Sequence, residues 1–204
     1  MIGAMKDLRG KLLLAAPEMG DPNFAKSVIL LVQHNAEGAL GLVLNQPTGT
    51  TVGEVLSQMG DEAGVECGVD APLYRGGPCE GPLMVLHRDP IHAQERVIDG
   101  VYFASEREYV EPVLAGAVSP ARFYAGYAGW GAGQLEGELA QSAWAVMDAS
   151  LDTVFPSQAL HSPSSDGEIF SDDAVWKSLI RVKTTSELMK GFNPKIVPRD
   201  PSMN

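Results

Sequence analysis

Gly126-Tyr-Ala-Gly-Trp-Gly-Ala-Gly-Gln-Leu-Glu136 carries the strongest structural signal in this sequence of 204 residues. Glycine adopts positive φ and allows close backbone approach, at a cost in chain entropy. The segment joins an aromatic run over 122–128, typical of a strand, to a helix predicted over Gln134–Ala140. We therefore predict a sharp corner between strand and helix here, with at least one glycine at positive φ.

Two more glycine-dense segments precede this corner, Gly38–Pro47 and Tyr74–Cys79. The β-branched run Ser27–His34 predicts a central strand, and Ala39–Asn45 predicts the second strand of a hairpin. Gly76-Gly77 lets the backbone pass close to a neighbouring group, and that neighbour is more often another strand than a ligand.

Apolar periodicity predicts further strands near 11–16, 73–75, 83–88, 101–104 and 144–147, and helices near 51–59, 106–115, 134–140, 151–155 and 172–182. We expect one α+β domain over 1–183 and an extended C-terminal tail over 184–204. The predicted core contains residues from the short apolar runs: Val28, Leu30, Leu42, Leu44, Val85 and Trp144.

The composition argues against several classes of function. Lys and Arg total 15 against 26 Asp and Glu, so the net charge of -11 disfavours direct nucleic-acid binding. No apolar run has the length of a membrane span or a signal peptide, which predicts a cytoplasmic protein without membrane contact. The spacing of Cys and His predicts no metal site, and the glycine segments lack a nucleotide-binding motif, so no cofactor is expected.

The glycine segments together make the chain resemble the YqgE/AlgH family of bacterial proteins. The matching residues run from Gly10-Lys-Leu-Leu-Leu through Gly38–Pro47, Tyr74–Pro78 and Gly126–Glu136 to Trp176. The resemblance covers roughly residues 8 to 183. It implies a mixed α+β fold with a small closed β-barrel-like core, a branching sheet and flanking helices. The resemblance carries over no established enzyme activity, and some members carry a transcriptional-regulator label.

Three side chains could converge on one polar pocket: His34 and His87 end strand-like runs, and Arg75 precedes the glycine pair. Such a pocket would bind a carboxylate or a metal. The alternative is that both histidines bond to loop backbone, and two histidines without a third ligand are a weak metal signal.

Three more residues have two interpretations each. Asn45 is either a binding side chain or a turn former that bonds to backbone groups. Trp130, with Tyr124 and Tyr127, forms either a stacking surface or part of the core. Cys79 stands where the family usually has an aliphatic residue, and it would be redox-active only if its pKa were lowered.

Two functions from different classes follow. The first is a non-catalytic binding or regulatory protein with an unknown protein or small-molecule partner. The alternative is an undiscovered hydrolase or transferase with His34, Arg75 and His87 around a glycine-lined polar cleft. The sequence does not predict the oligomeric state.

Overall fold

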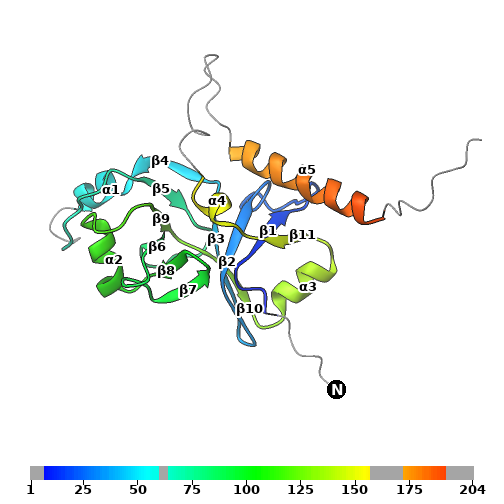
Figure 1. Cartoon of the computed structure of the whole chain (residues 1–204), viewed down its shortest axis with the longest axis horizontal. Coiled ribbons are helices and arrows are strands. Elements are labelled where there is room, and N and C mark those ends of the chain that lie inside the picture. The colour runs from blue at the N-terminus through cyan, green and yellow to red at the C-terminus, as the bar shows by residue number, and fades with distance from the viewer. Residues whose placement is uncertain (1–6, 60–63, 157–171, 192–204) are drawn as a thin grey trace, which may run out of the picture.

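The computed structural model describes residues 7–59, 64–156 and 172–191, which form an α+β protein with two β-sheets (Figure 1). The first sheet is antiparallel and has the strand order β10-β3-β2-β1-β11. Its strands are β1 (Lys11–Ala15), β2 (Val28–Asn35), β3 (Gly38–Val43), β10 (Ala128–Gly131) and β11 (Trp144–Asp148).

The second sheet is mixed, with the order β4-β5-β9-β6-β8-β7 and a parallel pair between β5 and β9. Its strands are β4 (Pro47–Thr51), β5 (Pro72–Arg75), β6 (Met84–His87), β7 (Glu95–Ile98), β8 (Val101–Ala104) and β9 (Ala121–Ala125). The predicted hairpin over 27–45 is confirmed as the pair β2–β3.

Helices cover the outer faces of the two sheets and part of the space between them. They are α1 (Val52–Met59), α2 (Arg107–Leu114), α3 (Gln134–Ala140), α4 (Leu151–Val154) and α5 (Asp172–Gly191). One apolar cluster lies between the sheets and includes residues of α4 and α5, a second lies under α3, and a third packs α1 and α2 on the second sheet.

The predicted core is confirmed, because all six residues are at most 5% exposed: Val28, Leu30, Leu42, Leu44, Val85 and Trp144. Side chains along β2 and β3 point alternately to the two faces of the first sheet, which explains why both strands are rich in apolar residues. Leu30 and Leu42 face the space between the sheets, whereas Ile29 and Val43 face α3, so both sides of the first sheet are buried.

Two expectations need correction. The first is the closed, barrel-like core, because both sheets have open strand orders in the described part of the chain. The short apolar runs do predict strands, but strand identity does not say whether a sheet closes. The second is the end of the last helix, because α5 continues past residue 183 to Gly191. Residues 192–204 of the expected tail lie outside the described residues, and the proposed domain division stays a prediction.

The glycine pair Gly76-Gly77 connects the two sheets at close range. The carbonyl of Gly76 accepts from the amide of Val43 in the first sheet, while its own amide donates to Ala125 in the second. A Cβ added at Gly77 would lie 2.2 Å from the Tyr127 carbonyl carbon. Only glycine fits this approach, so the pair packs against backbone, as the sequence predicted.

No helix in the described ranges is long and apolar enough to cross a membrane.

Candidate functional site

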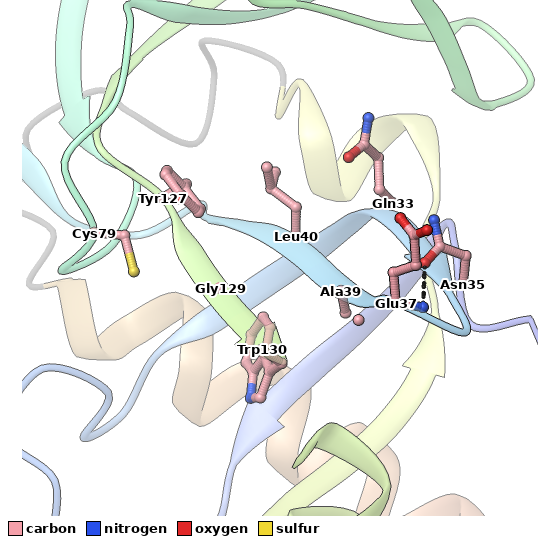
Figure 2. A pocket seen from close by; sticks show the side chains of 10 residues that line it. Gln33, Asn35, Glu37, Ala39, Leu40, Cys79, Tyr127, Gly129 and Trp130 are labelled. Atoms are coloured by element: carbon pink, nitrogen blue, oxygen red, sulfur yellow. Dashed lines mark hydrogen bonds between the residues drawn. The ribbon is translucent and has the colours of Figure 1, made fainter. Parts of the chain in front are cut away.

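A groove of about 440 Å³ runs beside β10 and the β2–β3 hairpin (Figure 2). We call it the β10 groove. Leu40, Tyr127 and Cys79 supply apolar surface, and Gln33 and Glu37 supply polar groups near the hairpin tip. The complete lining is Gln33, Asn35, Glu37, Gly38, Ala39, Leu40, Cys79, Tyr127, Gly129 and Trp130.

Backbone geometry holds Cys79 in the wall of this groove. Cys79 and Tyr127 form an isolated antiparallel bridge in which each amide donates to the other's carbonyl, at 2.9 and 3.0 Å. Residues on a strand alternate between its two edges, so the backbone groups of Gly129 also point away from β3, as those of Tyr127 do. The absence of a side chain at Gly129 leaves room beside the Cys79 thiol, since a Cβ there would lie 3.6 Å from its sulfur.

The corner after β10 is built by side chains of α3. Gly133 has φ +73° and begins the helix, which confirms the predicted positive-φ glycine. Gln134 Oε1 accepts from the Gly131 amide at 3.1 Å. Glu138 Oε2 accepts from the indole Nε1 of Trp130 at 2.9 Å and from that of Trp144 at 2.8 Å. Trp130 is 6% exposed, so its ring belongs mainly to the core.

His34 is held on both sides of its ring. Nδ1 accepts from the backbone amide of Leu8 at 3.1 Å, so the proton of the neutral ring lies on Nε2. Nε2 then donates to Glu136 Oε1 at 3.0 Å. The His34 side chain is 1% exposed, and it anchors the start of β1 and α3 to the end of β2.

His87 lies on β6 and is fully buried. Its Nδ1 accepts from the Asp89 amide at 3.3 Å, and its ring lies 6.2 Å from the ring of Tyr102. Nε2 has no partner among the described residues. Burial lowers the pKa of His87, and the carboxylate of Asp89 only partly opposes that shift.

Arg75 lies at the opposite end of the second sheet from His87. Arg75 is paired with Ala125 on β9, whereas His87 is paired with Ala121. Four residues of strand separate these positions, which corresponds to about 13 Å. His34 lies in the first sheet. The structure therefore does not bring the three proposed pocket residues together.

Arg75 instead borders a second hollow of about 490 Å³, which we call the Gly77 cleft. Its guanidinium donates to Asn23 Oδ1 at 2.9 Å. Cys79 borders both this cleft and the β10 groove. The cleft is lined by Arg75, Gly77, Pro78, Cys79, Glu80, Gly81, Ala125 and Gly126.

Asn45 bonds to backbone groups, which is the second of its two interpretations. Its Oδ1 accepts from the Val28 amide at 2.8 Å, and its Nδ2 donates to the Lys26 carbonyl at 3.0 Å. Asn45 is 6% exposed and closes the turn before β2.

Sequence reasoning missed the groove residues Gln33, Leu40 and Gly129, and it named Tyr127 only as part of an aromatic surface with Tyr124 and Trp130. Alternation gave one available signal: side chains three residues apart in an extended segment face opposite sides, so Tyr127 does not share the core-facing side of Trp130. The sequence could not show that Cys79 pairs with Tyr127, since that bridge joins segments about fifty residues apart.

The fold and the groove define a class: two-sheet α+β proteins whose glycine segments form the contacts between sheets and the wall of a shallow surface site. The family model described as AlgH-like, DUF179, matches residues 12–165, and the chain belongs to this family.

Relatives and solved structures agree with this membership. A UPF0301 protein of Chlorobaculum tepidum is 40% identical over 152 residues, which are 72% of this chain and 78% of the relative. A UPF0301 protein of Streptomyces coelicolor is 35% identical over 98% of this chain and 97% of its own length. The solution structure of AlgH from Pseudomonas aeruginosa matches with a TM-score of 0.64 and 28% identity, over 95% of this chain and 98% of that one.

Proposed function

We propose that this chain is a non-catalytic binding protein whose partner, a protein segment or a small molecule, occupies the β10 groove. The observation that carries the proposal is the groove itself, about 440 Å³ with Leu40, Tyr127 and Cys79 at its apolar part and polar groups beside them. An apolar surface with a few polar groups is the usual composition of a recognition site.

The positions of the histidines support binding rather than catalysis. His34 has both ring nitrogens engaged, by the Leu8 amide and the Glu136 carboxylate. His87 is buried away from the groove and its burial favours the neutral ring. A general base must reach the proton it removes, and neither ring lines the groove.

Any regulatory role would act through this partner rather than through DNA. The net charge of -11 opposes contact with phosphate, so the regulator label of some family members would apply here only indirectly. A cytoplasmic location stays a prediction of the sequence.

Cys79 provides a test that leaves the fold intact. A Cys67→Ser chain, expressed in the natural host, keeps one thiol in the groove, and N-ethylmaleimide would fill part of it. Native mass spectrometry should show a bound molecule or protein that disappears on labelling. The control is a Cys79→Ser chain treated in the same way, which should keep its partner. The proposal is contradicted if the partner stays bound after Cys79 is labelled. It is also contradicted if the parent chain carries no bound partner.

The alternative is a hydrolase or transferase, and the Gly77 cleft is the observation that favours it. Arg75 stands beside Gly77 and Gly126 in this cleft, so an anionic substrate would meet a guanidinium there, opposed by the carboxylate of Glu80 in the same lining. Turnover of activated esters or phosphates that is lost in Arg75→Gln would support this alternative. No turnover by the parent chain across such a panel would leave the binding proposal as the better account.

A further inference from the structure

We propose that the β10 groove binds an extended segment of another protein, which pairs antiparallel with the outer edge of β10 at Gly129. The segment carries an apolar or aromatic residue opposite Gly129 and a lysine or arginine two residues before it. This inference rests on the proposed function, and it specifies the partner as a basic peptide segment rather than a small molecule.

The backbone of Gly129 offers one open position for hydrogen bonds at the edge of the first sheet. β10 is an edge strand, and the outward groups of Tyr127 are already paired with Cys79. Two residues beyond Gly129, Gln134 Oε1 accepts from the outward amide of Gly131 at 3.1 Å. Between these two positions, no described residue pairs with the outward amide and carbonyl of Gly129. Such groups on an edge strand are a template for another strand.

The neighbours of Gly129 determine the direction of the added segment. With one residue available, both backbone groups are satisfied by a single partner residue only in an antiparallel pair, because opposite residues then exchange two hydrogen bonds. Cys79 occupies the next outward position, opposite Tyr127, so the segment must leave the edge after the residue that faces Gly129. The preceding residues of the segment therefore lie along Gly131, toward the tip of the β2–β3 hairpin.

The bare face of Gly129 forms a pocket for the apolar residue. Directly opposite residues on neighbouring strands place their side chains on the same face, so a side chain opposite Gly129 shares the face of Leu40. Leu40, Tyr127 and Cys79 surround Gly129 in the groove (Figure 2). A Cβ at Gly129 would lie 3.0 Å from the Tyr127 ring and 3.6 Å from the Cys79 sulfur. A phenylalanine or leucine of the segment would therefore cover Gly129 and contact these three side chains.

The tip of the β2–β3 hairpin carries the charge of the groove. Glu37 is the one residue of the groove lining that is charged at neutral pH, and it is exposed. Its carboxylate forms no ion pair with a described residue. Gly131 is paired with Gly38, so bare backbone separates Glu37 from a side chain that faces Gly131. The separation is two strand spacings, roughly 10 Å, which a lysine or arginine side chain and the glutamate bridge together.

One extended peptide matches both the pocket and the charge. Gly129 and Gly131 are two residues apart on β10, so the positions opposite them are about 7 Å apart and share one face. An extended chain repeats its side chains on one face at this same spacing. The apolar residue opposite Gly129 and the cation opposite Gly131 therefore belong to a single segment.

Charge complementarity selects a basic segment over an acidic one. The groove lining contains a carboxylate and neither lysine nor arginine, and the chain as a whole has a net charge of -11. The field of such a chain attracts a cationic segment and repels an anionic one before contact. Two backbone hydrogen bonds, one apolar side chain and one exposed ion pair make a small interface, so we expect a Kd of roughly 0.1–1 mM for an isolated peptide.

Titration of the 15N-labelled chain with short synthetic peptides, followed by amide NMR signals, tests the chemistry of the partner. The probes are the acetylated, amidated hexapeptides GSKTFS, GSETFS and GSKTAS. The signal of the Gly129 amide should move when GSKTFS binds. Replacing the lysine by glutamate or the phenylalanine by alanine should weaken binding at least about threefold, which is the effect expected for losing one exposed ion pair or more.

Two variants with matched controls locate the binding. Glu37→Lys should reverse the preference, so that GSETFS binds better than GSKTFS. Glu18→Lys makes the same charge change at an exposed residue beyond the other end of β2 and should keep the parent's preference. Gly129→Ala adds a methyl group to the pocket and should weaken binding of GSKTFS. Gly137→Ala adds one where nothing lies within 4 Å and should not.

The outcomes separate this proposal from the proposed function. No binding of GSKTFS at about 2 mM, above the expected Kd, overturns the peptide proposal. So does a preference for lysine that persists in Glu37→Lys, or unchanged binding in Gly129→Ala, while the NMR spectra show both variants folded. A small molecule that native mass spectrometry finds in the groove, and that the label at Cys79 displaces, would keep the proposed function and overturn the peptide as its partner.

Discussion

Glu138 fixes two tryptophans with one carboxylate. Its Oε2 accepts from both indoles, and its Oε1 accepts from Gln134 Nε2 at 3.0 Å. The two indole rings pack edge to face with centroids 6.1 Å apart. The glutamate therefore sets the geometry of the corner between β10 and α3.

Replacing Glu138 by alanine should leave two buried indole N–H groups without an acceptor. We expect a loss of about 2–4 kcal/mol in the free energy of unfolding, at roughly 1–2 for each orphaned donor. Chemical denaturation followed by tryptophan fluorescence measures this. Glu138→Gln keeps one acceptor oxygen and should lose less. Equal stability of parent and Glu138→Ala would show that the indoles find other acceptors.

His87 should make the stability of the fold depend on pH. Burial lowers its pKa below the ordinary 6.5, so at mildly acidic pH the unfolded chain binds a proton that the folded chain does not. The contribution of His87 to stability is thus fully present above about pH 6.5 and is lost as the pH falls toward the folded pKa. Urea titrations from pH 7.5 to about 5 should show this decline.

His87→Asn isolates that contribution, because its amide oxygen can still accept from the Asp89 backbone. We expect the variant to lose less stability than the parent between the same pH limits, whatever its stability at neutral pH. Parallel curves for the two chains would mean that other groups cause the decline.

The corner after β10 could be predicted from the sequence, because it depends on residues that are neighbours in the chain. Glycines at 129, 131 and 133 leave room for a sharp turn, and the helix over Gln134–Ala140 starts where the apolar spacing predicted. Strands β4, β7 and β10 were not predicted as separate elements. Pro47, Glu95 and two glycines give these short edge strands little β-propensity, and pairing with their neighbours forms them.

The candidate site was less predictable than the fold. Arg75 and His87 end strands that looked alike in sequence, but the parallel pairing of β5 and the antiparallel pairing of β6 against β9 send those ends in opposite directions. Strand direction within a sheet depends on topology, which local patterns do not contain. The involvement of Cys79 depends equally on a long-range bridge to Tyr127.

Alanine variants of two glycines in the corner segment allow the cost of backbone strain to be measured separately from the cost of steric crowding. Gly126 and Gly133 both have φ +73°. A Cβ at Gly126 would lie 2.7 Å from the Cys79 carbonyl oxygen, whereas one at Gly133 meets nothing within 4 Å. Gly133→Ala should therefore cost only the left-handed strain, about 1–2 kcal/mol. Gly126→Ala should cost more, because the bridge between Cys79 and Tyr127 must also move.

Thermal and urea denaturation of the two alanine variants measure that difference. The groove offers a second readout, since Gly126→Ala should change the rate at which Cys79 reacts with a thiol reagent and Gly133→Ala should not. Equal losses of stability and equal thiol rates in both variants would show that crowding at Gly126 has no effect.

Arg122 connects parts of the whole molecule that are distant in sequence. It lies on β9, and its guanidinium donates to the carbonyl of Val154 at 2.8 Å and to that of Leu44. The guanidinium carbon also lies 4.1 Å from the centre of the Tyr74 ring. One side chain thus joins the second sheet to α4 and to the segment that leaves the first sheet.

The neighbouring Tyr124 does not neutralise this cation. Burial raises the pKa of Tyr124 to about 12, so the phenol stays protonated at physiological pH. The charge of Arg122 is therefore stabilised by carbonyl dipoles and aromatic faces, which suit a planar guanidinium better than an ammonium group.

Removing this connection should destabilise the molecule as a unit. Arg122→Met keeps the apolar stem but loses both bonds to carbonyls, and we expect a loss of about 2–4 kcal/mol in the free energy of unfolding. Arg122→Lys should recover little, because one ammonium cannot span the carbonyls of Leu44 and Val154 while stacking on Tyr74. Arg96→Met is the control: its side chain is 62% exposed and, among the described residues, forms an ion pair only with Asp99, so it should change stability by less than about 0.5 kcal/mol. If Arg122→Lys were as stable as the parent, charge alone would suffice and the planar geometry would not matter. If Arg122→Met lost no more stability than Arg96→Met, the apolar cluster would hold the sheets together without Arg122.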